Sequence, residues 1–510
     1  MFAKVLAATI SGYEALTVTV EADSGKGLPS FEVVGLPDTS VSESRQRIKM
    51  AMVNSGCQPI RGHVVINLSP ADLRKEGSGF DLPILAAMLA ADGQISSELT
   101  ENYMFIGELG LDGKIKHTKA VLPIALMALQ SGCKGLVLPK DNSREALVVP
   151  GLNVISFTNI TDFVSAFSGK TPIVPDKPIE ELTEVVDADE TLVDLATIKG
   201  QTVAKRAIEI AAAGGHNIIL SGPPGSGKTL LAKAIPTIMP PLEFEEALEV
   251  TKIYSIKGLL KAGTGLIKHR PFRDPHHTIS DVALIGGGRI PAPGEVSLAH
   301  HGVLFLDELP EFKKSVLEVL REPLTSGVVS ISRAASTCSF PSQFLLVAAM
   351  NPCPCGFLTD PVHQCVCTAS QQQKYKSKIS GPLLDRIDLH VNVQRLTPEE
   401  LIEKPVGEAS KAIRERVVKA RAIQKKRNNK KKLLLNAHIP GKLLDELCIL
   451  SPDAKNILLN AARRFALSAR GYDKVIRIAR TIADLAQEKT ISVAHIAEAL
   501  QYRTVDLFNS

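Results

Sequence analysis

The sequence predicts an α/β fold in which a parallel sheet with helices on both faces is preceded by a smaller α+β domain. The first observation is a set of near-continuous apolar runs, NIILS, GVLFLD and FLLVAAM, which are typical of strands buried on both faces of a parallel sheet. The second is the stretch GPPGSGKT at 222–229, which stands between one such strand and a helix. The third is the length of 510 residues. At roughly 150 residues per domain, such a length indicates several domains.

Five segments follow one another along the chain. Residues 1–170 alternate short β-like runs with helical ones and predict the α+β domain. Residues 171–193 are rich in proline and acidic residues and predict a linker. The sheet-bearing core is expected over 194–395 and a basic helical connector over 396–436. Residues 437–510 carry apolar residues every three or four positions, which predicts a helical lid.

The composition is that of a globular protein, with 45% hydrophobic and 22% charged residues. The N-terminus has no secretory signal pattern, and no apolar run approaches the ~18 residues of a membrane span. We therefore expect a cytoplasmic protein without membrane contact. In that compartment the eight cysteines are expected to be thiols or metal ligands rather than disulfides.

The stretch GPPGSGKT predicts a site for the phosphates of ATP. Its glycines let the backbone curl so that successive N–H groups face the phosphates at the start of a helix. Lys228 is expected to reach the outer phosphates, and the hydroxyl of Thr229 is expected to bind Mg²⁺. The predicted cradle comprises Gly222, Pro223, Pro224, Gly225, Ser226, Gly227, Lys228 and Thr229.

Two further strands are expected to deliver polar groups to the same place. The strand GVLFLDE ends in Asp307, predicted to hold the magnesium shell, and in Glu308, predicted to polarise the attacking water. A surface acidic turn is the alternative. The strand FLLVAAMN ends in Asn351, which is placed to touch the terminal phosphate or the water.

A resemblance to a known family is carried by RPFRDPHHTISDVALIGGGRIPAPGEVSLAHHGVLFLDELPEF, AAMNPCPCG and GPLLDRIDLHV. These stretches resemble the magnesium-chelatase-type branch of the AAA+ P-loop nucleoside triphosphatases, and the whole chain is similar to the ComM/YifB family. In AAA+ ATPases the position of Asn351 senses the γ-phosphate. The resemblance also implies a hexameric ring in which an arginine of the neighbouring subunit completes each ATP site.

Several arginines are candidates for these family roles. Arg386 in LLDRID is the predicted finger, with Arg321 in LREPL in reserve, because a guanidinium spreads donors over the charge of the transferring phosphoryl group. A structural salt bridge is the alternative for Arg386. Arg470 matches the position of the family's second sensor, and Arg477 is the runner-up.

Four cysteines, Cys353, Cys355, Cys365 and Cys367, cluster directly after Asn351 as CPC and CVC. Four thiolates on a loop of this size can form a tetrahedral zinc site, which would stiffen the loop behind the sensing asparagine. The CxC spacing is less diagnostic than CxxC, so small unligated loop residues remain the alternative. The expected cofactors are thus ATP, Mg²⁺ and a structural Zn²⁺.

The first domain resembles the proteolytic domain of Lon over HVVINLSPADLRKEGSGFDLPILAAMLAA and YMFIGELGLDGKIKHTKAVLPIALMALQSGCKGLVLP. In Lon a serine nucleophile is activated by a lysine. Matching the motifs puts Gly79 at the serine position and Leu122 at the lysine position. A shifted pair of Ser78 and Lys119 is the alternative. We expect a Lon-protease-like domain without its catalytic dyad, used for assembly or DNA contact.

The segments expected to face the centre of the ring indicate which kind of polymer the ATPase moves. A glycine-rich stretch carries Arg289, and a predicted hairpin, SGVVSISRAASTCSF, carries Arg333 near its tip. The basic run KAIRERVVKARAIQKKRNNKKK at 411–432 can bind phosphate chains, or it can be a solvated helix face. Protein unfoldases present an aromatic pore loop, and this chain is only 4% aromatic. The adjacent His276 and His277 have no clear role, and a structural one is favoured.

Together these features favour DNA as the partner. The ComM resemblance implies an ATP-dependent hexameric DNA helicase that drives branch migration during recombination in natural transformation. The expected partners are single-stranded, forked or branched DNA, five further copies of the chain, and recombination proteins. A magnesium-chelatase-type motor subunit and an ATP-driven protein remodelling factor are the alternatives.

Overall fold

The computed structural model describes residues 1–25, 30–60, 62–75, 77–178, 192–288, 291–333, 336–396, 407–428 and 435–503. The chain forms two compact units. The first unit comprises Met1–Val186 together with Phe244–Lys268 and Ser332–Ser339. The second comprises Asp187–Glu243, His269–Ile331 and Phe340–Ser510. Two segments from beyond the linker thus belong to the first unit, which the sequence did not indicate.

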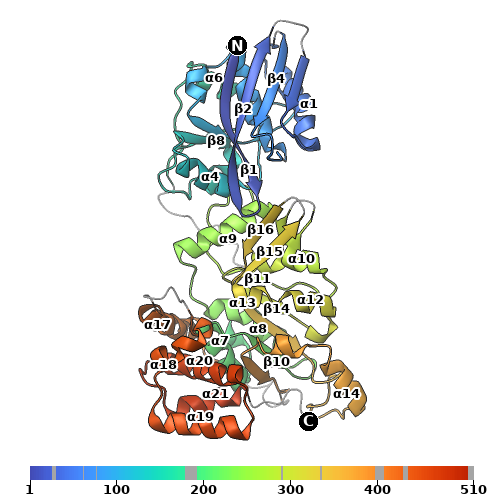
Figure 1. The fold of residues 1–510 in the computed structure, drawn as a ribbon, viewed down its shortest axis with the longest axis vertical. Helices are drawn as coiled ribbons and strands as arrows, with labels where there is room; N and C mark the ends of the chain where they lie inside the picture. The colour runs from blue at the N-terminus through green and yellow to red at the C-terminus, as the bar shows by residue number, and fades with distance from the viewer. Residues whose placement is uncertain are drawn as a thin grey trace. The chain divides into compact units, whose positions relative to one another are not determined.

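The first unit is built on a mixed seven-stranded sheet, in agreement with the predicted α+β domain (Figure 1). Its order is β3 (Ser30–Val34), β4 (His63–Ser69), β2 (Glu14–Gly25), β1 (Phe2–Ser11), β5 (Tyr103–Phe105), β8 (Gly135–Pro139) and β9 (Val154–Phe157). Strands β1, β2 and β4 pair antiparallel, whereas β1, β5, β8 and β9 run parallel. A small ribbon joins β6 (Glu108–Leu109) to β7 (Ile115–Lys116).

Helices of the first unit bury apolar faces against this sheet. Every residue of α2 (Asp81–Ala91) is buried, as the continuous apolar run that follows Asp81 suggests. The other helices are α1 (Thr39–Asn54), α3 (Ser97–Thr100), α4 (Val121–Gln130), α5 (Ser143–Ala146), α6 (Ile160–Phe167) and α9 (Phe244–Lys257), with short turns η1 (Ser78–Phe80) and η2 (Lys140–Asn142). Helix α9 docks through Ser255, whose hydroxyl donates to the buried carboxylate of Glu145 at 2.5 Å.

The second unit contains a five-stranded sheet whose strands all run parallel. Its order is β11 (Phe272–Arg273), β14 (Val303–Leu306), β17 (Leu345–Met350), β10 (Ile218–Ser221) and β18 (Leu389–Asn392). The three strands predicted from apolar runs are confirmed as β10, β14 and β17, and they are neighbours. Because parallel strands end at one edge, the polar residues that follow them meet there.

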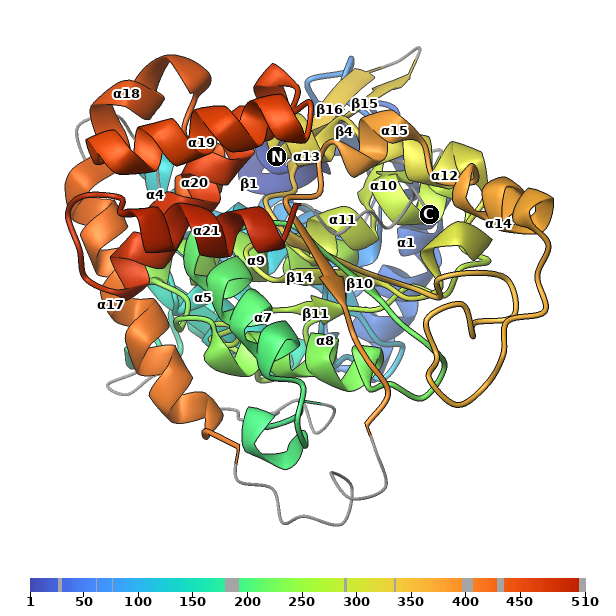
Figure 2. The same cartoon turned by 90° about the horizontal axis from the view of Figure 1, so that it is seen from below.

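Helices cover the faces of this sheet and continue into the predicted helical lid. Helices α7 (Thr202–Gly214) and α8 (Lys228–Ile238) lie beside the strands in Figure 2. The later helices are α17 (Ser410–Asn428), α18 (Leu444–Leu447), α19 (Pro452–Arg464), α20 (Ala469–Leu485) and α21 (Val493–Gln501). Shorter helices are α10 (Asp281–Ile285), α11 (Glu295–Leu298), α12 (Lys314–Val319), α13 (Pro323–Ser326), α14 (Ala369–Lys376) and α15 (Gly381–Leu384). The remaining short turns are η3 (Leu195–Thr197), η4 (Leu309–Glu311), η6 (Asn436–His438) and η7 (Gly441–Leu443).

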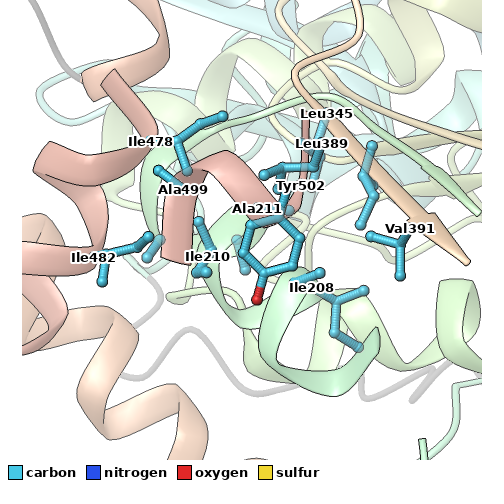
Figure 3. Packing of buried hydrophobic residues seen from close by; sticks show 14 of the residues in the cluster. Ile208, Ile210, Ala211, Leu345, Leu389, Val391, Ile478, Ile482, Ala499 and Tyr502 are labelled. Carbon is cyan, nitrogen blue, oxygen red and sulfur yellow. The ribbon is translucent and has the colours of Figure 1, made fainter. Parts of the chain in front are cut away.

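A single apolar core joins the sheet of the second unit to the lid (Figure 3). Ile210 of α7, Leu389 of β18 and Ile478 of α20 are fully buried within it. Burying one such side chain contributes about 1.5–3 kcal/mol. The lid helices are therefore packed into the same core as the nucleotide-binding sheet.

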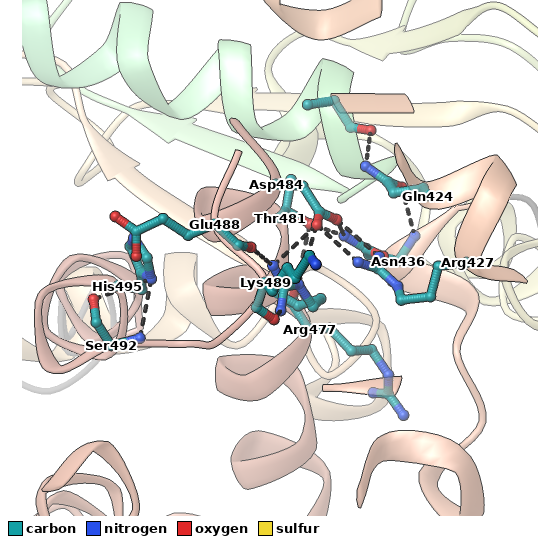
Figure 4. Close-up of polar contacts among 12 residues, drawn as sticks. Gln424, Arg427, Asn436, Arg477, Thr481, Asp484, Glu488, Lys489, Ser492 and His495 are labelled. Atoms are coloured by element: carbon teal, nitrogen blue, oxygen red, sulfur yellow. Dashed lines mark hydrogen bonds and ion pairs between the residues drawn. The ribbon is translucent and has the colours of Figure 1, made fainter. Parts of the chain in front are cut away.

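A buried polar network also connects the helices of the lid (Figure 4). Both terminal nitrogens of Arg427 on α17 donate to the carboxylate of Asp484 on α20, each at 2.8 Å. Asn436 donates to the same carboxylate at 2.8 Å and to the hydroxyl of Thr481 at 3.0 Å. A buried carboxylate with this many donors holds α17, η6 and α20 in one arrangement.

The two segments proposed to face a ring centre contain short antiparallel ribbons. The predicted hairpin is confirmed as β15 (Val328–Arg333) and β16 (Ser336–Pro341). The glycine-rich stretch pairs β12 (Gly286–Gly287) with β13 (Ala292–Pro293). Arg289 lies outside the described residues. Within the part of the chain that is described, no helix has the length and apolar character needed to cross a bilayer.

Candidate nucleotide site

The predicted phosphate cradle is a loop between the end of β10 and the start of α8 at Lys228. Gly225 and Gly227 have φ angles of +75° and +89°, which glycine adopts without steric cost. A Cβ atom on Gly222 would lie 2.1 Å from the carbonyl oxygen of Val393, so no other residue fits there. The glycines of the motif are thus required by the backbone of the loop.

The side chain of Lys228 lies in the middle of this loop and is only 9% exposed. Its ammonium donates to the carbonyl oxygens of Gly222 at 2.8 Å and Pro223 at 2.9 Å. It also donates to Oδ1 of Asn351 at 3.3 Å. Burial lowers the pKa of Lys228, and the charges of Asp307 and Glu308 oppose that shift. The ammonium can exchange these neutral acceptors for phosphate oxygens.

The two predicted magnesium ligands are in direct contact. The hydroxyl of Thr229 donates to Oδ2 of Asp307 at 2.9 Å, across the adjoining ends of α8 and β14. The backbone N–H of Glu308 donates to Oδ1 of Asp307 at 2.9 Å and fixes the carboxylate. Hydroxyl and carboxylate oxygens are the ligands that Mg²⁺ prefers, so these residues fit the ion.

Glu308 stands beside this pair with its side chain 56% exposed. Its φ of +50° is unusual for a residue with a side chain, and such strain is concentrated at functional sites. His277 approaches it, with Nδ1 3.5 Å from Oε2 of Glu308. The carboxylate is therefore open to solvent and held by a histidine on one side.

Three arginines of the second unit lie close enough to affect one another. Arg386 donates to the carbonyl oxygens of Arg321 at 3.2 Å and Pro382 at 2.7 Å, and to the hydroxyl of Thr325 at 3.0 Å. Burial lowers the pKa of Arg386, and the charges of Arg321 and Arg470 add to that effect. Among the described residues Arg386 makes no ion pair, which disfavours the salt-bridge alternative.

The two lid arginines differ in their surroundings. Arg470 is exposed at the start of α20 and contributes to the charge around Arg386. Arg477 instead donates to the carbonyl oxygen of Ile439 at 2.8 Å and pairs with Asp473 at 3.4 Å. The geometry therefore favours Arg470 as the lid residue able to reach a ligand.

Comparisons with known proteins match this architecture along the chain. The family described as magnesium chelatase, subunit ChlI, matches residues 194–401. The subunit ChlI of Mg-chelatase family matches residues 20–142, and the ChlI C-terminal family matches residues 407–503. The chain is 40% identical over 497 residues to uncharacterized protein YifB of Escherichia coli, covering 97% of this chain and 96% of that protein. It is 40% identical over 498 residues to competence protein ComM of Haemophilus influenzae, with 97% and 96% covered.

The chain belongs to the ComM/YifB family. The magnesium-chelatase 67 kDa subunit of Chlorobaculum parvum is a more distant relative, 28% identical over 167 residues. That similarity covers 32% of this chain and 24% of the subunit. A full-length relation therefore exists to the ComM/YifB proteins, and only a partial one to this chelatase subunit.

In this ComM/YifB chain the cysteine loop packs directly on the phosphate loop. A Cβ atom on Gly356 would lie 2.7 Å from Cδ of Pro224 and 3.8 Å from Cγ of Asn351. Gly356 follows Cys355 directly, so a shift of the cysteine loop would displace both the phosphate loop and Asn351.

The four cysteines have the spacing of a metal site. The Sγ atoms of Cys353, Cys355 and Cys365 are 3.3–3.6 Å apart, and all four sulfurs lie within 4.8 Å of one another. Tetrahedral zinc with Zn–S bonds of ~2.3 Å places its sulfurs about 3.8 Å apart, so the thiols fit the ion. All four are free cysteines. A backbone N–H of Phe357 lowers the pKa of Cys355, whereas burial raises the pKa of Cys353 and of Cys367, so a bound metal would have to displace protons from those two thiols.

Two residues near the nucleotide site had not been assigned from the sequence. Asp274 follows β11, and both burial and the charge of Asp307 raise its pKa. His277 lies 3.5 Å from Glu308, whereas its sequence context favours a merely structural role. Their strand, β11, has only two residues, so its apolar pattern was too short to mark its end as part of the sheet edge.

Several cations of the basic run at 411–432 are paired within the second unit and are therefore less available to a nucleic acid. Four of its cations bind groups of the second unit: Arg416 pairs with Glu209, Arg421 donates to Ala212, Lys425 pairs with Glu243, and Arg427 pairs with Asp484. The exposed cations that remain on α17 include Lys411, Arg414, Lys419 and Lys426. Lys430, Lys431 and Lys432 lie outside the described residues.

The first unit shows no lysine at the position of the Lon base. The hydroxyl of Ser78 donates to the carboxylate of Glu108. Lys119 lies instead beside Gly258. Leu122 is fully buried in the core, where a lysine would be costly. Ser78 and Lys119 thus contact different parts of the first unit, and the lack of a peptidase dyad stays a prediction.

Proposed function

We propose that this ComM/YifB protein is an ATP-driven hexameric DNA translocase that promotes branch migration during recombination in natural transformation. The main support for ATPase activity is the contact between Thr229 and Asp307, which lies beside Lys228 at the edge of a parallel sheet. The full-length similarity to a protein named for competence supports DNA as the moved polymer.

Each residue of the site has a distinct part in the proposed hydrolysis. Lys228 holds the outer phosphates, and Thr229 with Asp307 would hold Mg²⁺, which neutralises phosphate charge when bound. Glu308 orients and polarises the attacking water, for which its exposed carboxylate is suited. Asn351, already in contact with Lys228, reports whether the terminal phosphate is present.

Arg386, Arg321 and Arg470 complete the site of a neighbouring subunit in this proposal. The charges of Arg321 and Arg470 disfavour the charged form of Arg386, and an anion bound beside these guanidinium groups relieves that effect. The phosphates of ATP on the next subunit are such an anion. Hydrolysis then removes the attraction and lets the two subunits shift, which is the step that moves DNA.

We also propose that the four cysteines bind one structural Zn²⁺. Their sulfur spacing supports the ion, and the packing of Gly356 in the same loop against Pro224 suggests that the ion would stiffen a loop next to the phosphate site. Elemental analysis should find about one zinc per chain, and Cys353→Ser with Cys365→Ser should abolish it and slow ATP turnover. Zinc below a tenth of an equivalent in protein purified without chelator would contradict the site, as would unchanged zinc in the double variant.

The proposed function is tested with a synthetic four-way DNA junction. The wild-type protein with ATP should convert the junction into two duplexes, whereas Lys228→Ala and Glu308→Gln should not. Ser78→Ala, in the first unit and next to Gly79, is the matched control and should behave as the wild type. A wild-type protein that hydrolyses ATP but never moves the junction would refute DNA branch migration.

A magnesium-chelatase-type motor is the second candidate, favoured by the ChlI family match over residues 194–401. Such a motor would respond to a porphyrin-binding partner and be indifferent to DNA. The two candidates therefore differ in what raises the rate of ATP turnover.

A further inference from the structure

Two cavities in the first unit adjoin each other and are here together called the basic groove. The larger has a volume of about 850 Å³ and the smaller about 190 Å³, and they share Lys140 and Asp141. All of the residues that line them belong to the first unit. The groove is therefore separate from the nucleotide site.

The walls of the groove come from three distant segments that are tied together by hydrogen bonds. Asp176 accepts from the hydroxyls of Ser143 and Ser156, each at 2.5 Å. The backbone N–H of Gly263 donates to the carbonyl oxygen of Asp141 at 2.9 Å. The beginning of the predicted linker is thus docked as a wall, so the groove is a built feature of the unit.

The lining carries more positive than negative charge. Five cations, Lys114, Lys116, Lys140, Arg144 and Lys177, stand against the two acids Asp141 and Asp176, which leaves a formal charge of +3 with histidine neutral. Asp176 is partly compensated by Lys140 at 3.1 Å, and Lys114 pairs with Asp112 at 3.5 Å.

The remaining three cations are available to a ligand. Lys116, Arg144 and Lys177 are exposed and make no ion pair with any residue that the structure describes. Cations concentrated along a groove raise the local concentration of a polyanion.

We propose that the basic groove binds the phosphodiester backbone of a nucleic acid. The cations line both adjoining cavities rather than one point, which suits a polymer with a charge on every unit. Among the described lining residues His117 carries the one aromatic ring, so the groove offers little surface for stacking bases and favours contact with the backbone, which is independent of sequence. This inference rests on the proposed function, because it gives the translocated DNA a contact outside the ATPase unit.

The test compares two triple variants of the full-length protein. Lys116→Gln, Arg144→Gln and Lys177→Gln remove the unpaired cations of the groove. Arg45→Gln, Lys49→Gln and Lys170→Gln remove as many exposed cations from the same unit, outside the groove. Binding without nucleotide is measured by fluorescence anisotropy against salt, with a labelled oligothymidylate and a duplex of equal length.

The groove variant should bind at least about tenfold more weakly at low salt. The slope of log affinity against log salt should fall by about 2 for the single strand, since each lost phosphate contact removes about 0.7. The control should change affinity less than about twofold, because scattered surface charges contribute little. Unchanged DNA-independent ATP turnover shows that both variants are folded. The oligonucleotide that loses more affinity, single strand or duplex, is the form of DNA that the groove binds.

Each other result contradicts the groove in a distinguishable way. If the wild type binds DNA and the groove variant binds equally well, the groove is not a contact although the proposed function stands. If the wild type binds no DNA, both the groove contact and the proposed function are contradicted. If polyglutamate displaces the oligothymidylate from the wild type as well as unlabelled DNA does, the groove belongs to an acidic protein instead.

Discussion

At the scale of single residues, the phosphate loop shows how far a motif predicts geometry. The glycines, Lys228 and Thr229 lie where the motif places them, because the backbone leaves little freedom after a buried strand. The contact of Lys228 with Asn351 joins positions 123 residues apart, and only the parallel order of β10 and β17 brings it about. Asp274 and His277 had too little local pattern around them to be assigned.

Glu308 gives the sharpest prediction at this scale. Glu308→Gln keeps the shape of the side chain but removes the charge that polarises water, so ATP turnover should fall by about 10²–10⁴-fold. Binding of a fluorescent ATP analogue should change little, because the phosphate contacts lie on Lys228 and Thr229. Near-normal turnover in this variant would assign the water to another residue. Asp307→Asn, which should also weaken Mg²⁺ dependence, is the matched comparison.

At the scale of elements, α17 shows how a charge pattern can mislead. The sequence marked residues 411–432 only as basic, and no pattern told the cations of one helix face from those of the other. The structure separates them, because Arg427 reaches the fully buried carboxylate of Asp484 whereas Lys426 is exposed. The two neighbouring cations should therefore respond differently to substitution.

Arg427→Gln should destabilise the second unit by about 1.5–3 kcal/mol, because it removes one of the two guanidinium groups that pair with the buried carboxylate of Asp484, while Arg480 stays paired with it at 3.1 Å. Lys426→Gln, the neighbouring control, should stay within about 0.5 kcal/mol of the wild type. Urea unfolding followed by circular dichroism measures both. Equal stability of the two variants would show that the network around Asp484 does not hold the lid.

Strand β18 predicts a dependence of stability on pH. Burial lowers the pKa of His390 to about 3, and its Nε2 has no partner among the described residues. An unfolded histidine has a pKa of about 6.5, so below that pH His390 binds a proton in the unfolded chain but stays neutral in the folded chain. The free energy of unfolding should therefore fall with pH below about 6.5, by up to ~1.4 kcal/mol per pH unit from this residue.

His390→Phe should remove this component and flatten the decline between pH 6.5 and pH 4. Burial also lowers the pKa of His438 and His495, so a smaller decline should remain in the variant. Urea midpoints across this pH range measure the difference. An identical decline in wild type and variant would place the titration elsewhere.

At the scale of the whole molecule, the sequence predicted the α+β first domain, the parallel sheet of the core, the helical lid and the family. Each of these has strong local periodicity or a long motif. It did not predict that Phe244–Lys268 and Ser332–Ser339 join the first unit. Their own periodicity is ordinary, and contacts such as that of Ser255 with Glu145 depend on residues far away in the chain. Assembly of units is set by such long-range contacts, which a local pattern does not contain.

The proposed ring predicts that two inactive variants rescue each other. Lys228→Ala lacks a working phosphate loop, and Arg386→Ala lacks the finger offered to the next subunit. Mixed in equal amounts, they should form some boundaries with both residues intact and regain roughly a quarter of wild-type ATP turnover, because the interfaces of a ring are heterologous. A mixture no more active than its two components would place Arg386 outside the site of the neighbour.

The central claim is that ATP hydrolysis at these boundaries is coupled to DNA. It is tested most directly by the steady-state rate of ATP turnover of the purified protein with and without forked DNA. The account predicts a severalfold higher rate with the fork and no such rise in Glu308→Gln. A rate that is the same with and without any DNA would contradict it.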